Sequence, residues 1–172
     1  MNSIFITGAN GFIGTNLINQ FDDKYVFTIY EKSDVINIKN DIIIHLAGKA
    51  HDLKNVTNSD EYYIVNTCLT KRIFDKFLLS DAKVFITLSS VKAVADEVHG
   101  ELTEDVTPNP ITHYGKSKLL AEQYILSQPI QNAGEFSICN IGMNIRHNFL
   151  YLFPFHGCIE FSKCITWEIS ES

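Results

Sequence analysis

The sequence lacks the features that mark secreted, membrane-spanning or disulfide-stabilised proteins. Its four cysteines include no Cys-x-x-Cys pair, so their spacing indicates neither a structural metal site nor a disulfide framework. The first residues contain no basic region followed by a long apolar segment, and we therefore expect no secretory signal. No apolar run approaches the roughly 20 residues that a transmembrane helix needs. These absences predict a cytoplasmic protein with neither a metal ion nor a membrane anchor.

Positive charge is also scarce. The chain of 172 residues has a formal net charge of -6 at pH 7 and shows no basic patch, which argues against nucleic acid as a partner. Its length and its hydrophobic content of 45% suit one soluble domain with a sizeable core. A phosphate-bearing cofactor remains compatible, because backbone amides at a helix N-terminus hold phosphates locally whatever the total charge.

What the sequence does contain is an alternation of short β-rich runs with longer helical segments. Strands are predicted at residues 3–7, 25–30, 41–47, 83–88 and 136–141, and helices at 12–21, 60–79 and 113–127. This order predicts an α/β fold, a Rossmann-like doubly wound parallel sheet with flanking helices. We place an NAD(P)-binding domain at residues 1–138 and expect residues 139–172 to form an atypical, partly disordered tail.

A glycine-rich turn joins the first predicted strand to the first helix. Gly8 suits the tight turn, Gly11 lets the backbone approach a pyrophosphate, and Gly14 lets the helix pack closely on the sheet. Three glycines in an ordinary loop are the alternative, but the strand-turn-helix context favours cofactor binding. The residues predicted to bind the cofactor here are Gly8, Asn10, Gly11, Phe12, Ile13 and Gly14.

An acidic residue, Glu31, follows the second predicted strand. A carboxylate at this position accepts hydrogen bonds from the adenosine ribose hydroxyls, which favours NAD over NADP. Lys32 beside it leaves two alternatives open, because its cation could meet the 2′-phosphate of NADP or simply form a solvated pair with Glu31.

Tyr114 and Lys118 stand four residues apart on the predicted helix 113–127, so both project from the same face. A tyrosine with a pKa of about 10 is a poor base, but Lys118 and a positively charged nicotinamide together could lower that value. Ser89 and Ser90 follow the predicted strand 83–88, at the sheet edge where ligands bind. Ser90 could therefore hydrogen-bond a substrate oxygen beside Tyr114, although serines after a strand are often only turn formers.

Taken in order, these motifs resemble the extended short-chain dehydrogenase/reductase family, in its NAD-dependent epimerase/dehydratase branch. His45-Leu46-Ala47-Gly48 resembles the loop under the cofactor, Asn66 resembles an asparagine on the central helix, and Ser89-Ser90-Val91-Lys92 resembles the segment with the catalytic hydroxyl. The resemblance implies four catalytic residues and a second set that binds the cofactor. The catalytic residues would be Ser90 on the substrate, Tyr114 as acid and base, Lys118 on the nicotinamide ribose and phenolate, and Asn66 in a positioning role; Leu46, Ala47, Gly48, Lys49 and Ser89, with Tyr114 and Lys118, would contact the cofactor.

The resemblance also implies an activity. A nucleotide-sugar hydroxyl, on a UDP-hexose type of substrate, would be oxidised by hydride transfer, and the 4-keto sugar would be reduced from its other face. Val91-Lys92 follow Ser90 where sugar dehydratases carry Asp-Glu, so dehydration is disfavoured. A homodimer through helices 60–79 and 113–127 and a role in polysaccharide biosynthesis are further implications. A catalytically inactive dinucleotide-binding protein is the alternative.

The sequence departs from that family in two places. Only nine residues separate Glu31 from Asp41, where the family fits a helix and an edge strand, so residues 35–38 are expected to form only a stub strand. Later, Cys139-Asn140-Ile141-Gly142 stand where the family has an Arg-Pro step and a glycine turn. This second departure predicts a truncated chain that lacks most of its substrate-binding region.

Overall fold

The computed structural model describes residues 2–32, 35–49, 59–97, 106–129, 135–143 and 150–154. Its elements come in the following order along the chain: β1 (Ser3–Thr7), α1 (Phe12–Phe21), β2 (Val26–Ile29), β3 (Ile42–His45), α2 (Asp60–Tyr62), the π-helical segment η1 (Tyr63–Cys68), α3 (Leu69–Leu78), β4 (Val84–Ser90), the 3-10 turn η2 (Val91–Ala93), α4 (His113–Ser127), β5 (Glu135–Met143) and β6 (Leu150–Pro154).

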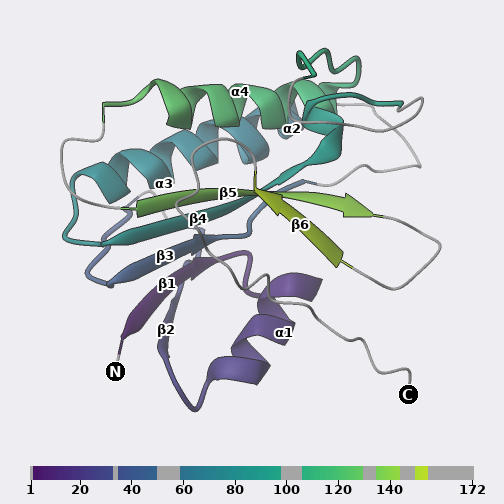
Figure 1. Cartoon of the computed structure of the whole chain (residues 1–172). Helices are drawn as coiled ribbons and strands as arrows, with labels where there is room; N and C mark the ends of the chain where they lie inside the picture. The colour runs from purple at the N-terminus through teal and green to yellow at the C-terminus, as the bar shows by residue number, and fades with distance from the viewer. Residues whose placement is uncertain are drawn as a thin grey trace, which may run out of the picture.

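One sheet organises the described part of the chain, in the strand order β2-β1-β3-β4-β5-β6. The neighbours from β2 to β5 pair in parallel, and β6 pairs antiparallel with β5. Helix α1 covers one face of the sheet, whereas α3 and α4 cover the other (Figure 1). The structure therefore confirms the predicted Rossmann-like, doubly wound architecture, in which the carboxyl ends of β1, β3 and β4 share one edge.

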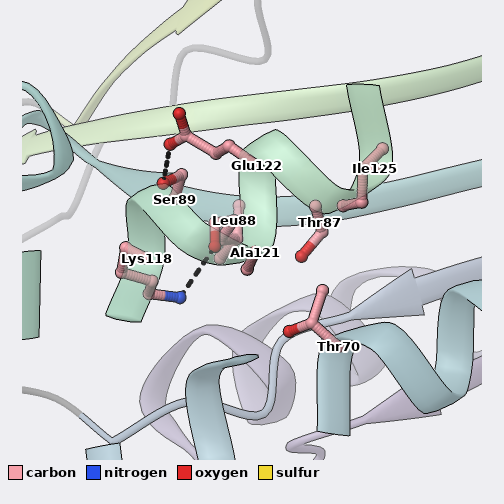
Figure 2. Close-up of a pocket in the computed structure, with 8 residues that line it drawn as sticks. All are labelled: Thr70, Thr87, Leu88, Ser89, Lys118, Ala121, Glu122 and Ile125. Atoms are coloured by element: carbon pink, nitrogen blue, oxygen red, sulfur yellow. Dashed lines mark hydrogen bonds between the residues drawn. The ribbon is translucent and has the colours of Figure 1, made fainter. Parts of the chain in front are cut away.

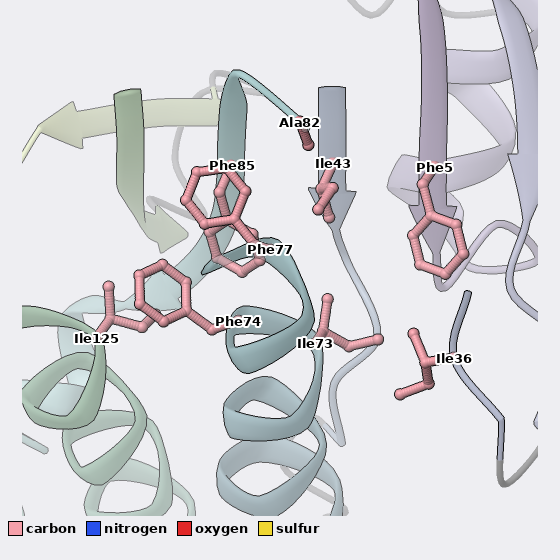
Figure 3. Packing of buried hydrophobic residues seen from close by; sticks show 9 residues of the cluster. All are labelled: Phe5, Ile36, Ile43, Ile73, Phe74, Phe77, Ala82, Phe85 and Ile125. Carbon is pink, nitrogen blue, oxygen red and sulfur yellow. The ribbon is translucent and has the colours of Figure 1, made fainter. Parts of the chain in front are cut away.

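Apolar side chains on both faces explain why the central strands are buried. On the α3 and α4 face, Phe74 and Phe77 pack around Phe85 of β4, with the ring centroids of Phe74 and Phe85 4.9 Å apart (Figure 3). On the opposite face, Ile4, Ile6 and Ile44 pack with side chains of α1. A strand buried on both faces needs a continuous apolar run, which is the pattern that β1 and β3 show.

Residues 35–38 differ from their prediction, because they form no strand. This short connection instead runs from β2 to β3 and turns the side chain of Ile36 inward, where it is buried in the cluster around Phe5 and Ile43. Asn40 holds the end of the connection by donating from Nδ2 to Thr28 Oγ1 at 3.0 Å. This segment is therefore anchored by the buried Ile36 side chain and not by strand hydrogen bonds.

Three further features were not predicted in detail. The helix expected at 60–79 contains the π-helical turn η1, and helical periodicity alone does not reveal a single π turn. Strand β5, predicted at 136–141, runs from Glu135 to Met143, and Leu150–Pro154 adds the antiparallel strand β6, which was not predicted. The domain boundary at 138 stays a prediction. Within the described ranges, no helix combines the length and the apolarity needed to cross a bilayer.

The aromatic cluster predicts a sharp difference between two apolar substitutions. We expect Phe85→Ala to lower the free energy of unfolding by about 3–5 kcal/mol, because the buried ring leaves a cavity among Phe74 and Phe77. Leu79→Ala is the control, since Leu79 is 82% exposed and should change stability by less than about 0.5 kcal/mol. Urea denaturation followed by circular dichroism measures both. Equal losses in the two variants would contradict this assignment of the core.

Candidate functional site

The glycine turn after β1 is held in a form that side chains would prevent. Gly8 has a φ of +72°, and a Cβ there would lie 2.6 Å from the backbone nitrogen of Ala47. A Cβ on Gly14 would lie 2.3 Å from the Gly8 carbonyl oxygen, so α1 packs directly on the turn. Gly11 caps α1 without a side chain to cover the first helical amides. These amides can therefore meet an anion such as a phosphate.

Asn66 ties the loop after β3 to the helices. This fully buried side chain accepts from Lys49 N at 2.7 Å through Oδ1, and its Nδ2 donates to Lys49 O at 3.1 Å and to Ser117 Oγ at 3.0 Å. Asn66 lies within the π-helical segment η1, and such segments occur frequently at functional sites. The asparagine predicted to position the site thus connects loop residue 49 with α4.

His45 extends this polar network to the glycine turn. The Thr70 hydroxyl donates its proton to Asn66 O at 2.7 Å, so the Thr70 oxygen must accept from His45 Nε2, 2.9 Å away. His45 Nδ1 then accepts from the Thr7 hydroxyl at 2.6 Å, and the Thr7 oxygen accepts from Ala47 N at 3.1 Å. Burial lowers the pKa of His45 to about 3, so the imidazole is neutral at physiological pH. A single tautomer of His45 therefore fixes the loop at Ala47 beside the glycine turn.

Tyr114 and Ser90 come together at the carboxyl edge of the sheet. Tyr114 lies in the first turn of α4, and its ring packs edge to face on Tyr62 with centroids 6.2 Å apart. Burial raises the pKa of Tyr114 above 10.0, and a hydrogen bond from the Ser90 hydroxyl offsets only part of that rise. The Lys118 ammonium donates to Leu88 O in this structure, and a lowering of the Tyr114 pKa by Lys118 together with a nicotinamide stays a prediction.

Lys118 reaches from α4 to β4, beside the loop that follows β3. Its Nζ donates to Leu88 O at 2.9 Å, and a Cβ on Gly48 would lie 3.4 Å from the same ammonium nitrogen. Burial lowers the pKa of Lys118 to about 8, while the charge of Glu122 acts in the opposite direction. Lys118 and Asn66 thus both adjoin Gly48 in the loop after β3.

The N-terminus of α4 is held by a carboxylate that the sequence did not single out. Asp96 accepts from Thr112 N at 2.9 Å and from Thr112 Oγ1 at 2.6 Å, and Thr112 Oγ1 in turn accepts from Gly115 N at 3.1 Å. A Cβ on Gly115 would lie 2.3 Å from Lys92 O, so α4 also presses on the turn that follows Ser90. These contacts set the register between Ser90 and Tyr114. Thr112 could have been identified as an N-cap residue, whereas nothing local links Asp96 to it.

The remaining predicted residues differ in their surroundings. Glu31 is exposed just beyond the carboxyl end of β2, and Phe12 is exposed at the start of α1.

Lys49 forms an ion pair with Glu61. The Ser89 hydroxyl donates its proton to the Glu122 carboxylate, so it could meet a cofactor only as an acceptor. Asn10 is exposed, and Ile13, Leu46 and Ala47 are half-buried around the turn.

Comparison with known proteins matches residues 29–143 to the NAD dependent epimerase/dehydratase family. GDP-6-deoxy-D-talose 4-dehydrogenase of Aggregatibacter actinomycetemcomitans is 31% identical over 86% of this chain and 56% of its own length. UDP-glucose 4-epimerase of Vibrio cholerae is 28% identical over 87% of this chain and 55% of its own. UDP-glucuronic acid 4-epimerase from Bacillus cereus, solved with NAD, shares the fold with a TM-score of 0.65, at 22% identity over 79% of this chain and 55% of that one. This chain spans about half the length of these relatives.

The Asp96 contacts predict a pH-dependent contribution to stability. Burial would raise the pKa of Asp96, but hydrogen bonds from Thr112 and Ile111 hold it below its ordinary 3.8. A carboxylate whose pKa is lowered by folding stabilises the folded state at pH values above its pKa in the unfolded chain. This stabilisation is lost as the pH falls through its pKa in the folded protein. We expect Asp96→Asn to lower the free energy of unfolding by about 1 kcal/mol at neutral pH, and by progressively less below pH 3.8.

Urea titrations at several pH values measure this difference. Asp81→Asn is the matched control, because it removes an exposed carboxylate far from α4 in sequence. An Asp96→Asn loss that stays constant down to the lowest pH would show that the carboxylate charge does not stabilise the α4 N-terminus.

Proposed function

Because this chain belongs to the NAD-dependent epimerase/dehydratase family, we propose that it binds NAD along the carboxyl edge of its sheet and acts on a nucleotide sugar. The observation that carries the proposal is the single polar network that joins the glycine turn to Asn66 and α4. This network ties the turn before α1 and the loop after β3 to α4, the helix that carries Lys118 and Tyr114.

The residues around the crevice fit a dinucleotide. The Gly8 turn forms a cradle that a Cβ would fill, and the amides of α1 beyond Gly11 face the place of a pyrophosphate. Glu31 would accept hydrogen bonds from the adenosine ribose, and the Lys118 ammonium would bind the nicotinamide ribose. Bound NAD would supply the hydride acceptor and a positive charge close to the phenol.

Tyr114 would move the substrate proton in this proposal. Its raised pKa keeps the phenol protonated at neutral pH, so the cationic surroundings of an occupied site would have to favour the phenolate. Ser90 already donates toward the same phenol oxygen and would hold the substrate hydroxyl beside it. The pair therefore has the arrangement of a general acid/base and a substrate-orienting hydroxyl.

The relatives suggest the class of substrate and the position of attack. Two of them are named for chemistry at carbon 4 of a GDP- or UDP-linked sugar. We propose oxidation and re-reduction at that carbon of a UDP-hexose type of sugar, which gives epimerisation. A cytoplasmic location and a homodimer complete the proposal; exposed Ile64 and Leu120, on η1 and α4, are apolar side chains that a second copy could cover.

Dinucleotide binding tests the first half of this function. We expect NADH to bind more tightly than NADPH, because a 2′-phosphate would meet the Glu31 carboxylate. Glu31→Ser should reduce this preference by about tenfold, which corresponds to about 1.4 kcal/mol. The fluorescence of bound NADH and NADPH measures both affinities, and Lys32→Ser serves as the matched control. A wild-type chain with equal affinity for the two cofactors would remove Glu31 from the ribose site.

Turnover tests the second half. Tyr114→Phe should lower the rate of sugar conversion by at least about 100-fold, the lower range for loss of a general acid/base, while NADH affinity stays within twofold or so. Purified chain is incubated with NAD and UDP-glucose, UDP-galactose or GDP-6-deoxy sugars, and products are separated by chromatography. If NADH binds but the wild type converts no sugar, the catalytic part of the proposal is wrong and the chain is a dinucleotide-binding protein.

A further inference from the structure

A small pocket with Lys118 in its lining lies between β4 and the helices that cover it (Figure 2). Thr70 and Thr87 line it together with Lys118, Ser89 and Glu122. Glu122 belongs to neither the predicted catalytic set nor the predicted cofactor set. It stands one helical turn after Lys118 on α4, as Lys118 stands one turn after Tyr114, so the three share a helix face.

Two consecutive residues of β4, Leu88 and Ser89, contact the two charged side chains of this pocket, Lys118 and Glu122. The Ser89 hydroxyl donates to the Glu122 carboxylate, and the carbonyl of Leu88 accepts from the Lys118 ammonium at 2.9 Å. Figure 2 shows both contacts, with the two side chains reaching β4 from the same helix. An ammonium taken out of water is costly unless a negative charge or an oriented carbonyl compensates it. Leu88 O supplies a hydrogen-bond acceptor for the ammonium, and Glu122 is the carboxylate that lines the same pocket one turn along α4.

We propose that Glu122 is a positioning residue, the half-buried counter-charge in this pocket that keeps the Lys118 ammonium charged while Leu88 O holds it at β4. This deepens the proposed function, because Lys118 is the residue assigned there to the nicotinamide ribose. In this proposal Glu122 acts on the site through Lys118 and through Ser89, the neighbour of Ser90.

The pKa values of the pair agree with this arrangement. Burial raises the pKa of Glu122, and the Ser89 hydrogen bond and the Lys118 charge oppose that rise. Burial lowers the pKa of Lys118 to about 8, and the Glu122 charge opposes that fall. Each charge therefore stabilises the other, and removal of either one should move the titration of its partner.

Other titratable groups near Lys118 change charge in different pH ranges. His45 on β3 feels the Lys118 charge, but its pKa of about 3 keeps it neutral throughout the titration of the lysine. Tyr114 on α4 has a pKa raised above 10.0, and so it ionises at higher pH than Lys118. Leu88 O, which accepts from the ammonium, and Asn66, which adjoins Gly48 as Lys118 does, do not titrate in this range. Among the described neighbours, a change near pH 8 thus reports Lys118 alone.

Direct titration of Lys118 tests the proposal without any ligand. The full chain is labelled with ¹³Cε-lysine, and the Lys118 resonance is identified by its loss in Lys118→Arg. In the wild type we expect a midpoint of about 8. Glu122→Gln keeps the size and one hydrogen-bond acceptor but removes the charge, and it should lower the midpoint by roughly one pH unit. Glu122→Asp, which keeps the charge, should restore most of that shift.

Controls separate charge from packing and from general effects. Asp23→Asn removes the same charge at the exposed end of α1, on the other face of the sheet, and should leave the Lys118 midpoint unchanged. The reciprocal measurement needs no substitution at Glu122, because Lys118→Gln should raise the midpoint of the Glu122 ¹³C carboxyl signal. This measurement also decides the matter if Glu122→Gln does not fold.

The proposal would be overturned if the Lys118 midpoint in Glu122→Gln stayed at the wild-type value. It would also be overturned if Glu122→Asp shifted that midpoint as much as Glu122→Gln does, or if the midpoint of the Glu122 carboxyl signal did not move in Lys118→Gln. NADH affinity is measured on the same samples. Absence of NADH binding in the wild type would refute the proposed function, while the coupling of Glu122 to Lys118 would still be decided by the titrations.

Discussion

The crevice depends on a chain of buried hydrogen bonds that runs from the Ala47 amide to Asn66, through Thr7, His45 and Thr70. Each group in this series of hydrogen bonds has a defined role as donor or acceptor, and loss of one member would leave a buried polar atom without a hydrogen-bond partner. The chain links β1, β3 and α3 at the edge where their loops meet. Because Asn66 also bonds Lys49 and Ser117, the same contacts hold the loop after β3 and α4 in register.

Charge at the crevice is arranged in a line along α4. Tyr114, Lys118 and Glu122 follow one another at one-turn spacing, and each is desolvated against β4. Burial favours the neutral form of all three side chains, so the charged forms depend on partners. Ser90 is the partner of the Tyr114 phenol, and Ser89 is the partner of the Glu122 carboxylate. Leu88 O and the Glu122 charge favour the Lys118 ammonium. Helix α4 can carry these groups so close to the sheet because Gly115 lets it approach the backbone at Lys92.

The order of elements and the family could be predicted because local patterns specify them. The runs that became β1, α1 and α4 have the predicted bounds, since a turn glycine, an N-cap threonine and clear periodicity mark their ends. The stub strand at 35–38 was wrong because a short apolar run looks the same whether it pairs at an edge or turns one side chain into the core, as Ile36 does. Strand β6 was missed because an edge strand is specified by the partner beside it.

The sequence by itself determined the Rossmann-like class, the glycine turn and the spacing of Tyr114 and Lys118, because all of these follow from residues close together in the chain. Only the tertiary structure decided what those groups contact. Asp96 meets Thr112 from 16 residues away, Ser89 meets Glu122 from 33, and Asn66 meets Ser117 from 51. The protonation of His45, Tyr114 and Lys118 was likewise a tertiary outcome, because desolvation depends on how completely other elements cover a group, which no local pattern states.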